Sequence, residues 1–162
     1  MRRPVEDAPT PIFRRAGAED VPRIMEIEKD GFRHPWSREL IERELGHAWS
    51  QILLAVEPSP GRAERVLGYI VFWLVHDEVH VLNVATALEA RRRGVGRALM
   101  RAAEGTGRSR GARIATLEVR RSNESAIALY LALGYRQVGV RPNYYSEEGE
   151  DAIVMVRELA MG

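Results

Sequence analysis

The chain has 162 residues, of which 45% are hydrophobic and 29% charged, and its formal net charge is +1. This length and composition fit one ordinary globular domain and argue against both wholesale disorder and a membrane protein. The small net charge does not favour bulk binding of nucleic acid. Because the chain has no cysteine, a disulfide framework, a cysteine nucleophile and a cysteine-ligated zinc are excluded.

The N-terminal residues carry no targeting or membrane signal. No apolar run reaches the ~20 residues of a membrane span, and the start of the chain lacks the apolar core of a signal peptide. We therefore expect a cytoplasmic protein with no membrane partner. Residues 1–11 are rich in proline and show no apolar period, which predicts a flexible arm, and residues 12–162 are predicted to form a single domain.

The predicted elements begin with a strand and two helices. Asp20 and Ser37 are both residues that cap helices well, and apolar residues follow each of them at helical spacing. Strands are expected at 51–56, 66–75 and 79–85, where β-forming residues dominate. The two later strands are separated by a short polar turn, which predicts a hairpin.

A third, amphipathic helix is predicted to start at Val95. Apolar residues recur there at positions i, i+3, i+4, i+7 and i+8, up to Ala103. Three glycines at positions 105, 107 and 111 are expected to loosen the chain after it. A strand over 113–119 should follow.

The C-terminal part is predicted to hold one helix and two strands. Asn123 should cap the helix and Gly134 should end it. The strands, near 135–140 and 151–156, flank a polar loop that contains Tyr144 and Tyr145. Together the elements predict a mixed sheet of the α/β (α+β) class.

The segment before the third helix carries the strongest binding motif, and it consists of Arg91, Arg92, Arg93, Gly94, Val95, Gly96 and Arg97. The first amides of a helix are unpaired and partly positive, so they bind phosphate, and glycines let the ligand approach closely. Leu99 stands where a dinucleotide fingerprint needs glycine, and the Gly-Lys-Ser/Thr of a P-loop is missing. The segment predicts a diphosphate-binding turn. A plain glycine turn with solvated arginines and a basic patch for nucleic acid are the alternatives.

This turn and several downstream motifs resemble the GNAT superfamily of N-acetyltransferases. The motifs are Arg-x-x-Gly-x-Gly in the turn, then Thr116 to Arg120, Ser122-Asn123, Ala126 to Tyr130 and Leu133 to Tyr135. Pro35 to Ser37, Asn143 to Tyr145 and Glu150 to Ile153 resemble, more narrowly, the bacterial ribosomal-protein-alanine N-acetyltransferases of RimI type. The resemblance extends over about residues 12–157. It implies a mostly antiparallel mixed sheet that is splayed between two central strands and flanked by about four helices.

The same resemblance implies the reactants and the residues that bind them. Acetyl-CoA would be the co-substrate, and the acceptor would be the N-terminal α-amine of a protein, a ribosomal protein that begins with alanine. The cofactor would be bound by the backbone of Val84, Ala85 and Thr86, by the turn from Arg91 to Arg97 at its pyrophosphate, and by Asn123 near its thiol arm. Glu118 would be the general base and Tyr130 the general acid.

The residues themselves are consistent with a base at Glu118. An α-amine has a pKa near 7.7–8.0 and must lose a proton before it attacks a thioester, directly to a base or through water. Glu118 alternates with Leu117 and Val119 on its strand, and partial burial is expected to raise its pKa. The alternative is a surface carboxylate paired with Arg113 or Arg120.

Tyr130 can protonate the departing thiolate, although it shares a helix face with apolar residues and can equally be a core aromatic. Trp36, Tyr144 and Tyr145 are candidates for contacts with the substrate peptide, because exposed aromatics offer a large contact area at small entropic cost. Ordinary loop packing is the alternative for these three.

The remaining predictions concern metal binding and the alternative functions. The four histidines are scattered without a carboxylate or metal-ligand pattern, so no metal site is predicted. Acetyl transfer to a small-molecule amine is the nearest alternative function. A non-catalytic acyl-CoA-binding module is the alternative of another class, and it would not need Glu118 and Tyr130.

Overall fold

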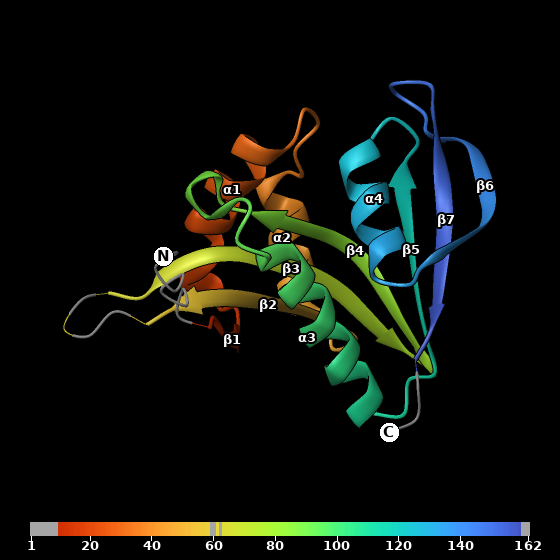
Figure 1. Ribbon diagram of the computed structural model, residues 1–162. Coiled ribbons are helices and arrows are strands. Elements are labelled where there is room, and N and C mark those ends of the chain that lie inside the picture. The colour runs from red at the N-terminus through yellow and green to blue at the C-terminus, as the bar shows by residue number, and fades with distance from the viewer. Residues whose placement is uncertain (1–9, 59–60, 62, 160–162) are drawn as a thin grey trace, which may run out of the picture. The chain divides into compact units, whose positions relative to one another are not determined.

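A computed structural model describes residues 10–58, 61 and 63–159, so the predicted arm at residues 1–11 lies almost entirely outside the described residues. The elements are β1 (Ile12–Arg15), η1 (Ala18–Asp20), α1 (Val21–Gly31), α2 (Arg38–Gly46), β2 (Ser50–Glu57), β3 (Arg65–Val75), β4 (Glu78–Thr86), η2 (Leu88–Ala90), α3 (Val95–Ser109), β5 (Ile114–Arg120), α4 (Glu124–Ala132), β6 (Arg136–Tyr145) and β7 (Glu150–Glu158) (Figure 1). Apart from the short 3-10 turns η1 and η2, this is the order that the sequence predicts.

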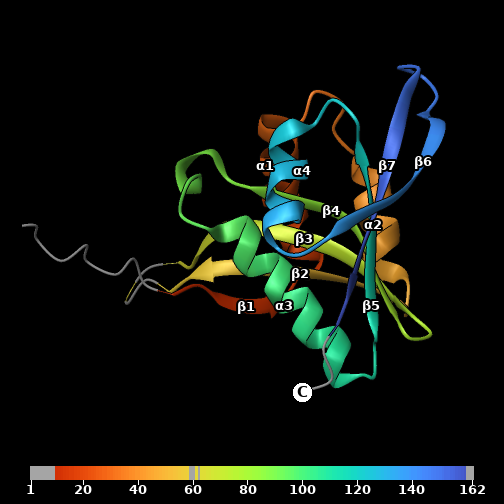
Figure 2. The ribbon, with the colours of Figure 1, turned by 45° about the vertical axis from the view of Figure 1, so that its right-hand side comes forward.

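The strands of the described residues form a seven-stranded mixed sheet in the order β1-β2-β3-β4-β5-β7-β6. β4 and β5 are parallel neighbours, with Glu78 opposite Ile114 and Val81 opposite Leu117. β7 runs antiparallel to both β5 and β6, and Figures 1 and 2 both show β6 at the edge beside it. The predicted mixed α/β class is confirmed. The splay between two central strands stays a prediction.

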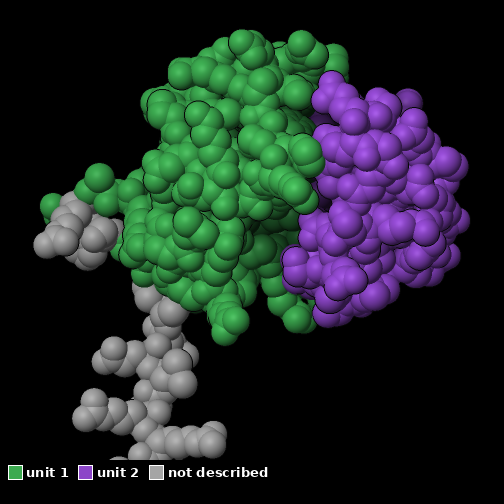
Figure 3. Space-filling view, turned by 90° about the horizontal axis from the view of Figure 1, so that it is seen from above, with its two compact units in different colours: residues 1–71, 83–102 green, residues 72–82, 103–162 purple. Residues whose placement is uncertain are grey.

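The chain divides into two compact units, which Figure 3 colours separately. The first unit consists of residues 1–71 and 83–102, and the second of residues 72–82 and 103–162. Each therefore takes part of β3, β4 and α3. A single domain over residues 12–162 stays a prediction.

In the first unit, α1 packs through one apolar face. Its residues Val21, Ile24 and Ile27 follow one another at intervals of three and are all buried. Asp20 precedes α1 as predicted, but its carboxylate accepts hydrogen bonds from Arg14 and from the Gly17 amide instead of capping that helix. The predicted cap of α2 is confirmed, because the Ser37 hydroxyl accepts from the Leu40 amide at 3.2 Å.

In the second unit, two glycines act differently from the prediction. α3 continues through Gly105 and Gly107 to Ser109. A Cβ on Gly107 would lie 2.1 Å from Cγ2 of Val79, so this glycine lets the helix approach β4 closely. Gly111, at φ 84°, is the one that suits a turn after the helix.

The last elements of the second unit follow the prediction except at β6. Asn123 caps α4, with its Oδ1 accepting from the Ala126 amide at 3.2 Å, and Gly134 follows the helix at φ 95°. The expected polar loop around Tyr144 and Tyr145 is wrong, because β6 extends through both residues and Tyr145 pairs with Glu150. An irregularity between Arg141 and Tyr145 lets the strand run on past the point where the sequence pattern breaks.

Candidate active site

The predicted diphosphate-binding turn lies in the first unit, between η2 and α3. Arg92 and Gly94 both have left-handed backbone conformations, at φ 65° and 75°. The Ala98 amide donates to the Gly94 carbonyl at 3.0 Å, so the amides from Val95 to Arg97 precede this first bond of the helix. Such amides are the donors that a phosphate can use.

The arginines of the turn differ in their partners. Arg91 Nη2 lies 3.5 Å from the Asp30 carbonyl oxygen, and Arg93 Nη2 lies 3.4 Å from Glu57 Oε1. Arg92 and Arg97 are exposed, and neither has an ion-pair partner within the part of the chain that the structure describes. These two guanidinium groups remain available to an anion at the start of α3.

Gly68 of β3 supports the turn, although the sequence analysis did not single it out. A Cβ there would lie 2.6 Å from the Ala85 carbonyl oxygen and 3.1 Å from Cγ1 of Val95. The glycine therefore lets the end of β4, which holds the predicted cofactor-binding residues 84–86, and the first turn of α3 both pack against β3. A lone glycine inside a strand pattern was the available signal.

Trp36 is anchored in the first unit by its backbone. Its amide donates to Glu28 Oε2 at 2.7 Å, and Glu28 is fully buried. The other oxygen of Glu28 accepts from the Tyr69 hydroxyl and from the Asn83 side-chain amide. Burial, reinforced by the Glu28 carboxylate, raises the pKa of Tyr69 far above its ordinary value. The connector between α1 and α2 is thereby fixed, while the Trp36 side chain is only half-buried.

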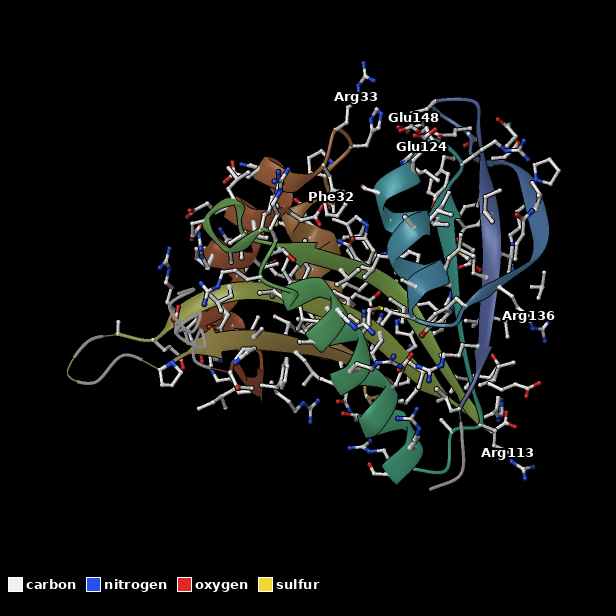
Figure 4. All side chains as sticks on the ribbon, in the orientation of Figure 1. Phe32, Arg33, Arg113, Glu124, Arg136 and Glu148 are labelled. Atoms are coloured by element: carbon white, nitrogen blue, oxygen red, sulfur yellow. The ribbon has the colours of Figure 1, made fainter. Side chains whose placement is uncertain are left out.

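Glu118 lies on β5 in the second unit, with its side chain only 9% exposed. Its Oε2 is 2.6 Å from His80 Nε2, and its Oε1 is 3.6 Å from Arg141 Nη2. The alternative pairing with Arg113 or Arg120 is therefore wrong. Arg120 instead pairs with the acidic residues at the β6–β7 turn, where Figure 4 labels Glu148.

The hydrogen bond with His80 sets the charge of Glu118. It lowers the pKa of the carboxyl group below its ordinary value and outweighs burial, which acts in the opposite direction. The positive charge of Arg141 contributes in the same sense as the hydrogen bond. The expectation of a raised pKa is wrong, because the effect of burial is outweighed, and Glu118 is ionised at neutral pH.

His80 is the residue of this site that the sequence analysis missed. In the parallel register of β4 on β5 it stands opposite Thr116, and Glu118 is two residues further along the same face. The Trp73 ring meets the imidazole edge-on, with ring centroids 5.7 Å apart. A single sequence gives no register between strands, so no local signal pointed to this pair.

Tyr130 is buried on α4 in the second unit. Its side chain is near that of Tyr135, with ring centroids 6.0 Å apart, so the alternative of a core aromatic is confirmed, and the role as general acid stays a prediction. Burial raises its pKa well above the ordinary value, with a smaller contribution from Tyr145. Among residues 10–58, 61 and 63–159, none forms a hydrogen bond with the Tyr130 hydroxyl. The group keeps its proton at neutral pH and is not committed to another acceptor in the chain.

Tyr144 and Tyr145 form an aromatic pair next to Glu118. Their rings are perpendicular with centroids 5.1 Å apart, and Tyr144 is 47% exposed. The Arg120 guanidinium lies 3.8 Å from the Tyr145 ring, and that of Arg141 lies 5.5 Å from the Tyr144 ring. Burial raises the pKa of Tyr145 to about 12. The Arg141 guanidinium thus lies near both the exposed ring of Tyr144 and the carboxylate of Glu118.

Asn123 is held at the start of α4, where Figure 4 labels the neighbouring Glu124. Its Oδ1 accepts from the Ala126 amide and from the Ser125 hydroxyl, at 3.2 and 3.3 Å. The cap uses the carbonyl oxygen of the side chain. Its Nδ2 amide group is therefore the part of Asn123 that can contact a ligand.

The described part of the chain lacks two further features. No group of three or more histidine, aspartate or glutamate side chains there could hold a metal ion. No helix there is long and apolar enough to cross a membrane.

Known proteins resemble the chain over most of its length. Residues 21–135 match the model of the acetyltransferase (GNAT) family. The [ribosomal protein bS18]-alanine N-acetyltransferase of Salmonella typhimurium is 32% identical over 144 residues, which are 88% of this chain and 93% of that protein.

Solved structures of known acetyltransferases share the fold of the chain. The crystal structure of the ribosomal-protein-S18-alanine N-acetyltransferase from Escherichia coli superposes with a TM-score of 0.80, at 29% identity, over 94% of this chain and 96% of that one. The crystal structure of NAA60 from Arabidopsis thaliana in complex with acetyl-CoA shares the fold, with a TM-score of 0.79 at 20% identity over 93% and 99% of the two chains. The match to the family model over residues 21–135 and the 32% identity with the Salmonella typhimurium protein over 88% of the chain show that the chain belongs to the GNAT family of acetyltransferases.

Proposed function

We propose that the chain transfers the acetyl group of acetyl-CoA to the N-terminal α-amine of a ribosomal protein that begins with alanine. The observation that carries this proposal is the ionised carboxylate of Glu118. The Arg141 guanidinium lies near both this carboxylate and the exposed ring of Tyr144. A base beside an aromatic surface suits an acceptor that is a peptide. The Salmonella typhimurium relative, whose name states this reaction, aligns with 88% of the chain, which supports the same acceptor here.

The first unit has donors that fit the pyrophosphate of acetyl-CoA. The amides of residues 95–97 open a helix of fifteen residues, and Arg92 and Arg97 are exposed cations beside them. The backbone of residues 84–86 would hold the acetyl and pantetheine portions, and an amide near Val84 and Ala85 would stabilise the developing negative charge on the carbonyl oxygen. When bound, acetyl-CoA supplies the activated thioester.

Glu118 acts as the general base. Its pKa lies below the ordinary value of 4.5, whereas an α-ammonium group has a pKa of about 7.7–8.0. Complete proton transfer to Glu118 before attack would therefore cost at least about 4 kcal/mol. The neutral fraction of the amine starts the attack, and Glu118 takes the proton, directly or through water, as the nitrogen bonds to the carbonyl carbon and its N–H becomes acidic.

Tyr130 acts as the donor to the leaving sulfur. Burial keeps its hydroxyl protonated, and the residues of the described chain leave that hydroxyl without an acceptor. It can therefore donate a hydrogen bond, and then a proton, to the sulfur as negative charge develops there. Asn123 would contact the thiol arm through its Nδ2 amide, and Trp36, Tyr144 and Tyr145 would contact the peptide.

The test is release of coenzyme A from acetyl-CoA in the presence of peptides that differ only in their first residue. Alanine peptides should be the best acceptors. Glu118→Gln and Tyr130→Phe should each lower kcat by about 10²-fold or more and leave the KM for acetyl-CoA near that of the unmodified protein. Arg113→Ala, an exposed change outside the site, is the matched control.

Three outcomes decide between the alternatives. No release with any peptide or amine would overturn the enzymatic proposal in favour of an acyl-CoA-binding module. Faster release with a small amine than with every peptide would overturn the protein acceptor. Full activity of both Glu118→Gln and Tyr130→Phe would leave acetyl transfer in place and remove these two residues from the mechanism.

A further inference from the structure

The contact between His80 and Glu118 requires one proton between the two side chains. Nε2 and Oε2 are 2.6 Å apart, and two lone pairs facing each other at that distance would repel. Glu118 is ionised and can only accept. The imidazole is therefore the donor, and the proton is on Nε2.

Two other described side chains, Trp73 and Arg141, lie beside the pair of His80 and Glu118. Trp73 of β3 packs edge-on against the His80 ring. Arg141 of β6 faces Oε1 at 3.6 Å, which is too long for a hydrogen bond. The Glu118 carboxylate in turn acts electrostatically on Tyr145 of β6 and contributes to the raised pKa of that phenol. Oε2 is thus committed to His80, while no side chain among the described residues donates a hydrogen bond to Oε1, which has the Arg141 cation nearby.

We propose that His80 is a positioning residue for Glu118: by donating Nε2–H to Oε2 it fixes the carboxylate so that Oε1 receives the proton of the acceptor amine. The proposal rests on the role of Glu118 as general base. It also makes Arg141 a competing partner for the carboxylate, because without His80 the Glu118 side chain can turn toward the guanidinium group. Such a bidentate ion pair would occupy both oxygens and slow proton transfer.

The position of the donor atom allows a sharp test. A glutamine at position 80 places its amide nitrogen about where Nε2 of histidine lies, whereas an asparagine places its nitrogen one bond short, near Nδ1. His80→Ala and His80→Asn should lower kcat by about ten- to hundredfold, the loss expected when a hydrogen bond to a charged group is removed. His80→Gln should retain kcat within about threefold of the unmodified protein. The KM for acetyl-CoA should not change in any of the three.

These kinetic outcomes are decisive once unfolding temperatures show that the variants are folded. Rescue by glutamine but not by asparagine supports the proposal. Unchanged kcat in His80→Ala overturns it, and so does an equal loss in the folded Gln and Asn variants, because the position of the donor would then not matter.

A spectroscopic test does not depend on activity. In the unmodified protein, the Nε2 proton of His80 should give a slowly exchanging downfield NMR resonance that is absent in Glu118→Ala. If this resonance is present but no acceptor is acetylated, the proposed function fails while the hydrogen bond stands. If it is absent from an active enzyme, the positioning role fails while the proposed function stands.

Discussion

The Nε2 atom of His80 lies 2.6 Å from Oε2 of Glu118, across the parallel strands β4 and β5. This contact decides the charge of the proposed base, because the hydrogen bond lowers its pKa where burial alone would have raised it. A base of this kind is always ready to accept a proton at neutral pH. It is also weak, so the basicity of the acceptor amine becomes important.

The first prediction concerns pH. Because the pKa of Glu118 lies below 4.5, this carboxylate stays ionised between pH 6 and pH 9, whereas the acceptor amine loses its proton near pH 7.7–8.0. The value of kcat/KM for a peptide should therefore rise with pH and level off above the pKa of its amine. Measuring the profile with two peptides whose amines differ in basicity should give two different midpoints. A common midpoint would show that an enzyme group controls the reaction in this range.

The second prediction concerns the turn before α3. Arg97→Ala should raise the KM for acetyl-CoA about two- to fivefold, because an exposed ion pair is worth at most about 1 kcal/mol. The effect should shrink as salt is added, since salt screens exposed charges. Arg113→Ala removes another exposed arginine, which Figure 4 shows pointing away from the ribbon, and should leave this KM unchanged. Equal effects of the two changes would mean that net charge, and not the turn, matters.

The third prediction concerns Gly68. Gly68→Ala should lower the free energy of unfolding by about 1–3 kcal/mol, because its Cβ would meet the Ala85 carbonyl oxygen at 2.6 Å and Cγ1 of Val95 at 3.1 Å. Gly46→Ala is the matched control: nothing lies within 4 Å of its Cβ, and it should stabilise the fold by up to about 1 kcal/mol. Urea unfolding of both variants provides the measurement. Equal stability of the two would contradict the close packing at β3.

The fourth prediction concerns Asp20, whose carboxylate accepts from Arg14 through both oxygens, at 2.8 and 2.9 Å. Hydrogen bonding to Arg14 lowers the pKa of Asp20 in the folded state below its ordinary 3.8. The stabilisation is therefore complete above that value and is lost as the pH falls through the lower, folded-state pKa. Asp20→Asn should lower the free energy of unfolding by about 1.5–3 kcal/mol at pH 7.

The same comparison at low pH tests the cause. As the pH falls below about 4 the difference between Asp20→Asn and the unmodified protein should shrink, and it should disappear below the folded-state pKa of Asp20, where both proteins lack the charge. Glu26→Gln, which removes an exposed partner of Arg23, should cost less than about 1 kcal/mol at either pH. A penalty for Asp20→Asn that does not depend on pH would point to packing instead of the ion pair.

Much of the fold could be predicted because its signals are local. Ser37 and Asn123 cap helices with their own side chains, and the amides that they bind lie three residues away. Gly107 shows where local reasoning fails. In sequence it indicates a break, but in the structure it lies inside a helix, where Val79 leaves no room for a Cβ.

In the candidate site, too, some features follow from the local sequence and others only from the tertiary structure. The sequence by itself determined the turn from Arg91 to Arg97, because a glycine-rich helix start is built from consecutive residues. It also placed Glu118 and Tyr130 on the right elements. Only the tertiary structure decided the state of Glu118, because its partner His80 is thirty-eight residues away and meets it through the register of two parallel strands. Register depends on the packing of whole strands, and a carboxylate takes its pKa from the groups that this packing brings to it.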